Sequence, residues 1–176
     1  AGQFLTVLNV PKSEVDKAIK SVVDSYKNRY YEEKLGIQAE NKISSVIIQE
    51  MVASEYSGVL FTANPKGILN ETVIVVGKGL GSSIVEDKAE TITYHHYRDG
   101  ATYKEGNVLN FPENLVKELE KTGERIEKLF GKPMDIEFAV KDEKIYILQA
   151  REITGLDFTL PVRILDNSNI AESYPG

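Results

Sequence analysis

Two segments of the chain have the spacing of apolar residues that is typical of amphipathic helices. From residue 13 to about residue 36, apolar side chains recur every three or four positions, which gives a helix one face for packing on a core. Ser13 suits the N-cap of this helix, and Gly36 suits the left-handed position after its last turn. A second such segment covers residues 112–130, and Pro112 fits its first turn. We therefore expect two main helices.

Shorter runs rich in β-branched and aromatic residues predict strands. They cover residues 4–10, 45–52, 58–62, 72–76, 90–97, 134–140 and 144–150. Short polar turns separate the second run from the third, the fifth from Thr102, and the last two from each other, so each of these pairs is expected to form a β-hairpin. The uninterrupted fourth run predicts a central strand that is buried on both faces. Together these elements indicate an α+β fold with a mostly antiparallel sheet.

Composition excludes several classes of protein. Of the 176 residues, 41% are hydrophobic and 27% are charged, which suits a globular domain with a hydrophobic core. The chain has no cysteine, so it has neither disulfides nor thiolate metal sites. Its net charge of −6 argues against a nucleic-acid-binding module, because such modules present a basic face. No apolar run approaches the length of a membrane span, so we expect a cytoplasmic protein without nucleic-acid or membrane partners.

The last predicted hairpin carries the most informative polar residues. Residues two apart share one face of a strand, so Asp135 and Glu137 point the same way, and so do Gln149 and Arg151. When the two strands pair, these side chains form one polar patch with apolar residues behind it. Carboxylate and amide oxygens are ligands that Mg²⁺ uses together with phosphates, and a guanidinium pairs with phosphoryl oxygens. The pattern suits phosphoryl transfer; taken alone, it is also that of an ordinary amphipathic hairpin with a surface ion pair.

Three other features each have a plain structural interpretation. Residues 46–52 can offer backbone groups to the edge of an adenine, or can form a simple core strand. The glycine loop at residues 77–83 can wrap a phosphate with its backbone N–H groups, or can be a turn between strands. It lacks the residue order of a P-loop and of the dinucleotide-binding fingerprint. His95 and His96 have no partner at metal-ligand spacing, so we interpret both as structural.

Taken together and in this order, the segments resemble a known family. The matching residues are Ala1-Gly2-Gln3, Thr6, Leu8-Asn9-Val10, VIIQEMV at 46–52, SGVLFT at 57–62, Asn64-Pro65, Gly79-Leu80-Gly81, Asp135-Ile136-Glu137 and Leu148-Gln149-Ala150-Arg151. They are similar to the nucleotide-binding domain shared by phosphoenolpyruvate synthase, pyruvate phosphate dikinase and rifampicin phosphotransferase, which has an ATP-grasp fold. The resemblance covers nearly all of residues 1–154. The motifs of the last hairpin are its most specific part.

The resemblance implies a role for each matching residue. It places ATP between two subdomains, with Arg151 as the catalytic residue that stabilises charge on the phosphates. Glu137 and Gln149 would be ligands of both Mg²⁺ and phosphate. The nucleotide-binding residues that the resemblance implies are Gly2 and Thr6 in the wall beside the phosphates, Gln49, Glu50, Met51 and Val52 in the adenine hinge, and Asp135, Glu137 and Gln149 in the hairpin.

The resemblance also implies an activity that needs more than this chain. Residues 1–154 would be the C-terminal part of the ATP-grasp domain, and residues 155–176 a linker toward a phosphohistidine domain. The whole enzyme would be a phosphotransferase of the kinase or dikinase type. It would bind ATP and Mg²⁺ and pass a phosphoryl group to a histidine carrier, and then to pyruvate or another acceptor. The family's upstream subdomain, with a lysine and an arginine for the phosphates, is expected before Ala1, so the chain alone should bind ATP weakly and be inactive.

Several alternatives stay open beside this interpretation. The chain could come from a rifampicin phosphotransferase-like enzyme or from an ATP-grasp carboxylate–amine ligase. It could also be a nucleotide-binding module without catalytic activity. One departure from the family pattern is Ser82, because the family usually has glutamate after the Gly-Leu-Gly motif.

Overall fold

The structure, a computed structural model, contains two compact units. It describes residues 5–26, 45–79, 90–106 and 109–156. The first unit, residues 1–51, contains a short 3₁₀ helix, η1 (Lys12–Glu14), and the helix α1 (Val15–Tyr26). The second unit, residues 52–176, contains β1 (Tyr56–Phe61), β2 (Glu71–Lys78), β3 (Thr91–Tyr97), β4 (Thr102–Gly106), α4 (Glu113–Phe130), β5 (Met134–Lys141) and β6 (Lys144–Glu152).

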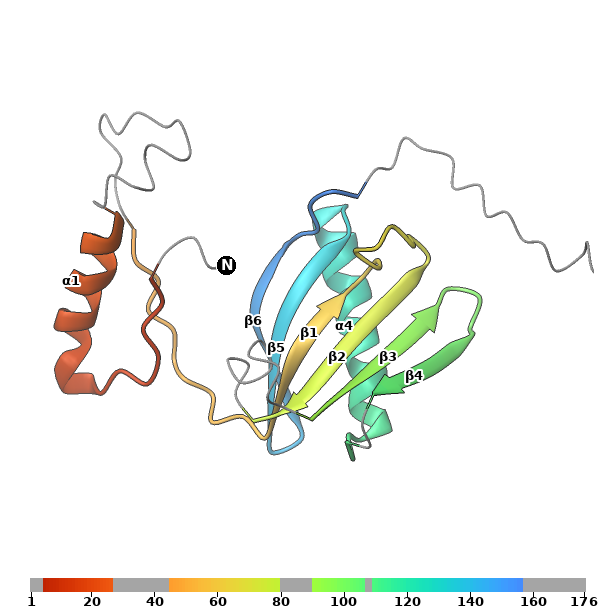
Figure 1. The fold of residues 1–176 in the computed structure, drawn as a ribbon, viewed down its shortest axis with the longest axis horizontal. Helices are drawn as coiled ribbons and strands as arrows, with labels where there is room; N and C mark the ends of the chain where they lie inside the picture. Colours follow the sequence, from red (N-terminus) through yellow and green to blue (C-terminus); the bar gives the residue numbers. More distant parts are fainter. Residues whose placement is uncertain (1–4, 27–44, 80–89, 107–108, 157–176) are drawn as a thin grey trace, which may run out of the picture. The chain divides into compact units, whose positions relative to one another are not determined.

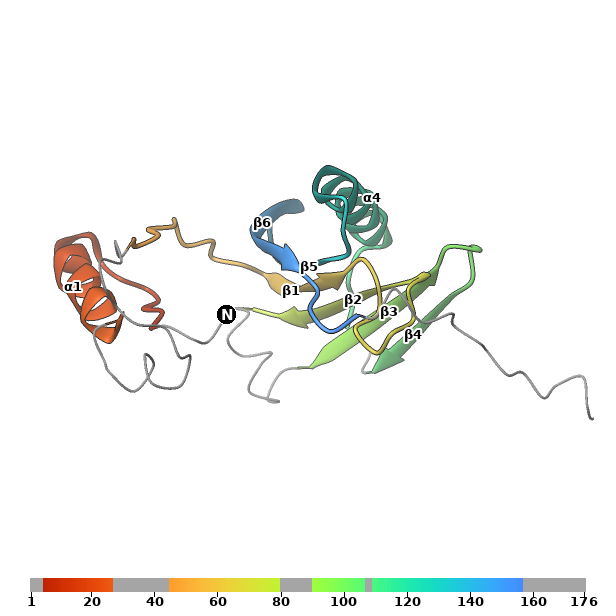
Figure 2. The same ribbon diagram turned by 90° about the horizontal axis from the view of Figure 1, so that it is seen from above.

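The second unit is a six-stranded antiparallel sheet with a helix on one face. The strand order is β4-β3-β2-β1-β5-β6, and every neighbouring pair is antiparallel (Figure 1). Figure 2 shows α4 lying along one side of this sheet. The predicted α+β fold with a mostly antiparallel sheet is confirmed. Among the helices in the described part of the chain, none has the length and apolar character that a membrane span requires.

The core lies between α4 and the sheet. Leu115, Val116 and Leu119 of α4 are each 1% exposed. They belong to one cluster with alternate residues of the strands, which include Leu60, Ile74, Val76, Tyr94, Ile136, Phe138 and Val140. This alternation is the period of two that a strand imposes on its side chains. It leaves every second residue of each strand on the opposite face of the sheet.

Two glycines allow close approaches inside this core. A Cβ added to Gly123 of α4 would lie 2.6 Å from Leu60 Cδ2, so this glycine lets the helix pack tightly on β1. A Cβ added to Gly58 of β1 would lie 2.0 Å from the carbonyl oxygen of Val75 and 2.7 Å from Cζ of Phe138. Phe138 is the cross-strand partner of Gly58. Its ring therefore fills the space that a side chain at position 58 would need.

Most predicted elements are present, with small changes at their ends. The helix predicted at residues 112–130 is α4, which ends where Gly131 adopts a left-handed conformation with φ of 68°. The hairpins predicted around residues 98–100 and 141–143 are β3–β4 and β5–β6, and the predicted central strand is β2. The first predicted helix is present as α1 up to Tyr26. Its predicted end at Gly36 lies outside the described residues.

Two predicted strands are wrong. Residues 5–10 form no strand, and Phe4 lies outside the described residues. Residues 45–54 form no strand either, so the predicted hairpin between 45–52 and 58–62 does not exist. The physical reason is that β1 already has two partners, since β2 occupies one of its edges and β5 the other. Ile47 and Ile48 are accordingly 89% and 67% exposed, although their β-branched side chains favour a strand.

Candidate functional site

The face of the sheet opposite α4 carries two rows of side chains that run across all six strands. Cross-strand partners share a face, so the register defines each row. One row is Tyr103, His95, Val73, Phe61, Asp135 and Arg151. The neighbouring row is Glu105, Thr93, Val75, Val59, Glu137 and Gln149. We call this surface the site face. The polar patch predicted for the last hairpin lies at its β5–β6 end.

A β-bulge in β6 determines which side chains reach the site face. Phe138 pairs with Ile147 and Glu137 pairs with Gln149, so Leu148 is an additional residue in β6. Strict alternation would place Ile147 and Gln149 on the same face. The bulge separates them, because Ile147 shares the helix-covered face with Phe138, and Gln149 shares the site face with Glu137. The alternation in the sequence predicts the polar patch, but the bulge that keeps Ile147 out of it was not predicted.

Asp135 and Arg151 form the most closely defined contact of the patch. They are direct cross-strand partners. Asp135 Oδ2 accepts a hydrogen bond from Arg151 Nε at 2.8 Å, and the same oxygen lies 2.6 Å from Arg151 Nη2. Asp135 is 8% exposed, whereas the side chain of Arg151 is 49% exposed. The guanidinium is thus held at one edge by a buried carboxylate, and its other N–H donors remain on an accessible group.

Glu137 and Gln149 lie next to this ion pair and are partners of each other across the strands. Both are partly buried, and both offer hard oxygen donors. Within the described ranges, no group of three or more His, Cys, Asp or Glu residues could hold a metal ion. Mg²⁺ does not need such a group, because it is commonly bound by one or two carboxylates together with phosphates and water. The donor set here fits a magnesium ion that arrives with a phosphate ligand.

The other predicted nucleotide-binding residues are not part of this hairpin. The predicted hinge residues have neither helix nor strand structure, and Met51 is 43% exposed. They are divided between the two units: Gln49, Glu50 and Met51 belong to the first, and Val52 begins the second. Thr6 lies in an exposed segment of the first unit, and Gly2 lies outside the described residues. Their roles in nucleotide binding stay predictions.

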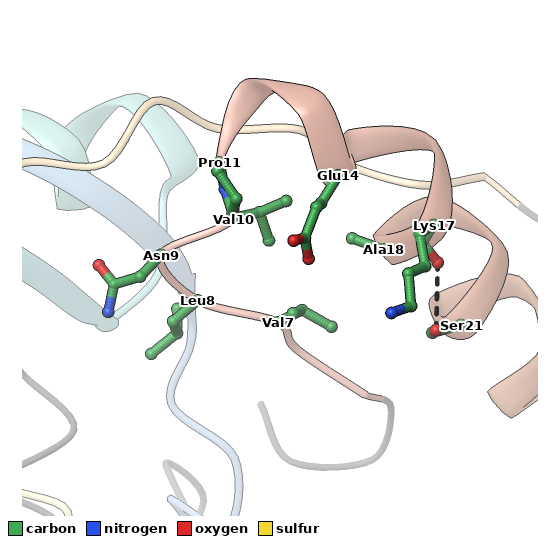
Figure 3. Close-up of a pocket in the computed structure, with 9 residues that line it drawn as sticks. All are labelled: Val7, Leu8, Asn9, Val10, Pro11, Glu14, Lys17, Ala18 and Ser21. Carbon is green, nitrogen blue, oxygen red and sulfur yellow. Dashed lines mark hydrogen bonds between the residues drawn. The ribbon is translucent and has the colours of Figure 1, made fainter.

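The first unit contains a small cavity of its own. Its lining includes Val7, Pro11 and Ala18, with the side chains of Glu14 and Lys17 at its edge (Figure 3). Its volume is about 180 Å³, whereas pockets for drug-sized ligands usually measure about 300–1,000 Å³. The cavity is therefore too small to enclose a nucleotide.

A buried cluster around Glu71 occupies the site face at the ends of β2 and β3. Glu71 is 1% exposed and accepts a hydrogen bond of 2.6 Å from Asn64 Nδ2. Nδ1 of His95 lies 2.6 Å from the other carboxylate oxygen, and the ring of Tyr103 stacks on His95 at 4.1 Å. The turn sequence around Asn64 predicts a bend, but nothing in the sequence pattern predicts that Glu71 and His95 pair. The cluster connects the turn after β1 to the β3–β4 hairpin.

We expect the contribution of Glu71 to stability to depend on pH. Burial raises the pKa of Glu71, but hydrogen bonds from Asn64 and His95 lower it by more, so its pKa in the fold lies below its ordinary value of 4.5. The resulting stabilisation is present above pH 4.5 and is lost as the pH falls through the lowered pKa. Glu71→Gln should therefore lower the free energy of unfolding at pH 7 by about 1 kcal/mol or more. Urea unfolding should show this deficit shrinking toward pH 3, and a deficit independent of pH would contradict the expectation.

The sequence matches a protein family that is described as "Pyruvate phosphate dikinase, AMP/ATP-binding domain". The match covers residues 1–110 and 86–171, which is most of the chain. It therefore includes the whole of the β5–β6 hairpin and the predicted hinge.

Individual relatives agree with this match. The chain is 33% identical to a probable phosphoenolpyruvate synthase of Archaeoglobus fulgidus, over 89% of the chain and 25% of the relative. It is 32% identical to a probable phosphoenolpyruvate synthase of Methanocaldococcus jannaschii, over 89% of the chain and 16% of the relative. A rifampicin phosphotransferase of Bacillus cereus is 32% identical over 66% of the chain and 16% of the relative. The chain thus spans a quarter or less of the length of these relatives.

Proposed function

Because this chain belongs to the pyruvate phosphate dikinase AMP/ATP-binding family, we propose that it binds Mg·ATP on the site face and contributes the phosphate-facing residues of a phosphotransferase. The observation that supports this proposal is the composition of the patch on β5 and β6. One cross-strand pair offers a carboxylate and an amide, and the adjacent pair offers an accessible guanidinium held by a buried carboxylate. Phosphoryl transfer needs both kinds of group close together.

Each residue of the patch has a separate task in this proposal. Glu137 and Gln149 would hold the Mg²⁺, which would supply positive charge to neutralise the phosphates. Arg151 would donate hydrogen bonds to the transferred phosphoryl group and oppose the negative charge that it carries in the transition state. The bulge at Leu148 helps both tasks, because it places Gln149 and Arg151 on the same face as Glu137.

The remainder of the site follows from the family. Gln49, Glu50, Met51 and Val52 would form the hinge for the adenine, with Gly2 and Thr6 beside the phosphates. Residues 1–154 would form the C-terminal part of an ATP-grasp domain, and residues 155–176 would lead to a domain with the histidine carrier. The final acceptor would be pyruvate, as the phosphoenolpyruvate synthase relatives suggest. An antibiotic acceptor is the second candidate, because a rifampicin phosphotransferase is among the relatives.

Removal of the Glu137 carboxylate tests the proposed magnesium site. In a polypeptide that joins the family's upstream subdomain to this chain, Glu137→Ala should weaken the binding of Mg·ATP by roughly tenfold or more, which is about 1.4 kcal/mol. Isothermal titration with and without Mg²⁺ measures the effect, and the loss should be much smaller when the metal is absent.

Glu143→Ala is the matched control, because Glu143 lies exposed in the turn between β5 and β6. It removes the same charge from the same hairpin and should leave the affinity unchanged. Equal affinities of the wild-type chain and Glu137→Ala would overturn the assignment of the metal site.

A further inference from the structure

We propose that Asp135 is a positioning residue, which orients the guanidinium of Arg151 toward the phosphoryl group and does not itself bind the nucleotide or the metal. The inference rests on the proposed function, because it presumes that Arg151 meets a phosphate. It changes the role expected for Asp135, which the motif alone groups with Glu137 as a second carboxylate for the nucleotide.

The first argument is the register of the hairpin. Asp135 lies opposite the cationic Arg151, whereas Glu137 lies opposite the uncharged Gln149. The charge of Asp135 is therefore balanced within the protein, while that of Glu137 faces a neutral amide. A divalent cation is attracted to the carboxylate whose charge is not already balanced by a neighbouring cation. The register thus separates the two carboxylates into different roles.

The second argument is the burial and geometry of the contact. The side chain of Asp135 is 10% exposed, against 49% for that of Arg151. Both contacts, from Nε at 2.8 Å and from Nη2 at 2.6 Å, go to the same oxygen, Oδ2. A buried carboxylate requires such charge-assisted contacts. They fix one edge of the planar guanidinium, and the N–H donors of Nη1 are left for another anion.

The third argument concerns the cost of ordering the arginine. An arginine side chain carries about 2 kcal/mol of rotamer entropy. Because Asp135 already restrains Arg151, part of this entropy is lost when the protein folds and not when the ligand binds, which favours binding. A neutralising carboxylate also weakens the attraction of Arg151 for a phosphate. The benefit of Asp135 is therefore geometric, and the oxygen contact matters more than its negative charge.

A double-mutant cycle on Asp135 and Arg151 tests the inference. The affinity for Mg·ATP and the rate of phosphoryl transfer are measured for wild type, Asp135→Ala, Arg151→Ala and the double variant. In each case the chain is joined to the family's remaining domains, so that phosphoryl transfer can be measured. Loss of a residue that supports a ligand-binding group typically costs about 10–100-fold, so Asp135→Ala should lower the rate by about that factor. In the Arg151→Ala background, the same change should alter rate and affinity less than twofold.

Two further variants sharpen the test. Asp135→Asn keeps an oxygen that can accept from Nε, so it should recover most of the rate that Asp135→Ala loses, and it serves if the alanine variant fails to fold. Glu152→Ala removes a different ion pair of the same hairpin, the one between Glu152 and Lys132 at 2.8 Å, and should change neither quantity. In nucleotide-free protein, the Nε–H resonance of Arg151 should shift and exchange faster with water in Asp135→Ala than in Asp135→Asn.

The outcomes distinguish this inference from the proposed function. If Arg151→Ala changes neither affinity nor rate, the proposed role of Arg151 fails, and the inference fails with it. Suppose instead that Arg151→Ala has a large effect, and that Asp135→Ala lowers the rate by the same factor with and without Arg151. Asp135 then contacts the ligand directly, and only the inference is overturned. An Arg151 Nε–H resonance that is the same in nucleotide-free wild type, Asp135→Ala and Asp135→Asn would also overturn it.

Discussion

Replacing Arg151 by alanine is expected to slow phosphoryl transfer by about a thousandfold or more. Arg151 is the only arginine or lysine in the two rows of the site face. One edge of its guanidinium contacts Asp135, and its side chain is 49% exposed. Charge spreads over the oxygens of the transferred group in the transition state, and a planar guanidinium can donate to two of them at once. The rate should therefore fall much more than the affinity for ATP.

The measurement is single-turnover transfer of phosphate from ATP to the carrier, in a polypeptide that joins this chain to the family's other domains. Arg151→Lys should recover only a small part of the rate, because an ammonium group lacks the fork that binds both Asp135 and a phosphate. Arg125→Ala is the control. Arg125 is an exposed arginine of α4, on the helix-covered side of the sheet. Equal losses in Arg125→Ala and Arg151→Ala would show that the effect is general, and would contradict the assignment of Arg151.

Replacing Gly58 by alanine is expected to destabilise the sheet strongly, although it adds only one methyl group. The new Cβ would lie 2.0 Å from the carbonyl oxygen of Val75 and 2.7 Å from Cζ of Phe138. The first contact is with backbone, so it cannot be relieved by rotating a side chain, and β1 and β2 would have to move apart. Overpacked cores typically lose about 1–3 kcal/mol, and we expect Gly58→Ala to lower the free energy of unfolding by roughly 3 kcal/mol.

Urea unfolding followed by circular dichroism measures this loss. The matched control is Gly100→Ala in the β3–β4 turn. There the added Cβ meets no atom within 4 Å, but the φ of 93° is unfavourable for alanine, so the loss should be about 1 kcal/mol. Combining Gly58→Ala with Phe138→Leu should relieve the second contact and leave the first. A Gly58→Ala protein as stable as Gly100→Ala would contradict the packing of β1 in this sheet.

Local sequence patterns were sufficient to predict the elements whose partners are adjacent in the chain. The β5–β6 hairpin needs only a turn at Asp142 and Glu143, and α4 needs only its own apolar stripe, so both were predicted correctly. Alternation correctly grouped Asp135 with Glu137 and Gln149 with Arg151, but the two pairs share one face only because of the bulge at Leu148.

Features that depend on distant parts of the chain were not predictable in this way. The run at residues 45–52 has the composition of a strand, but both edges of β1 are occupied by β2 and β5. The bulge at Leu148 lets both Ile145 and Ala150 pack against the core, although they are an odd number of residues apart. The pairing of Glu71 with His95 depends on β2 and β3 being neighbours. In each case, tertiary packing determined the result and local propensity did not.

The position of β1 in the sheet has a consequence for how the chain folds. β1 comes first along the chain among the strands that the structure describes, yet it lies between β2 and β5. The four strands β1 to β4 can form a meander as soon as they are synthesised, but the second edge of β1 stays unpaired until Met134–Lys141 has emerged, since Tyr56 pairs with Val140. This long-range pairing is expected to form late, because closing a long loop is entropically unfavourable. Until then the exposed edge of β1 is a template for intermolecular pairing, so nascent or truncated chains that end before β5 should be the species most prone to aggregate.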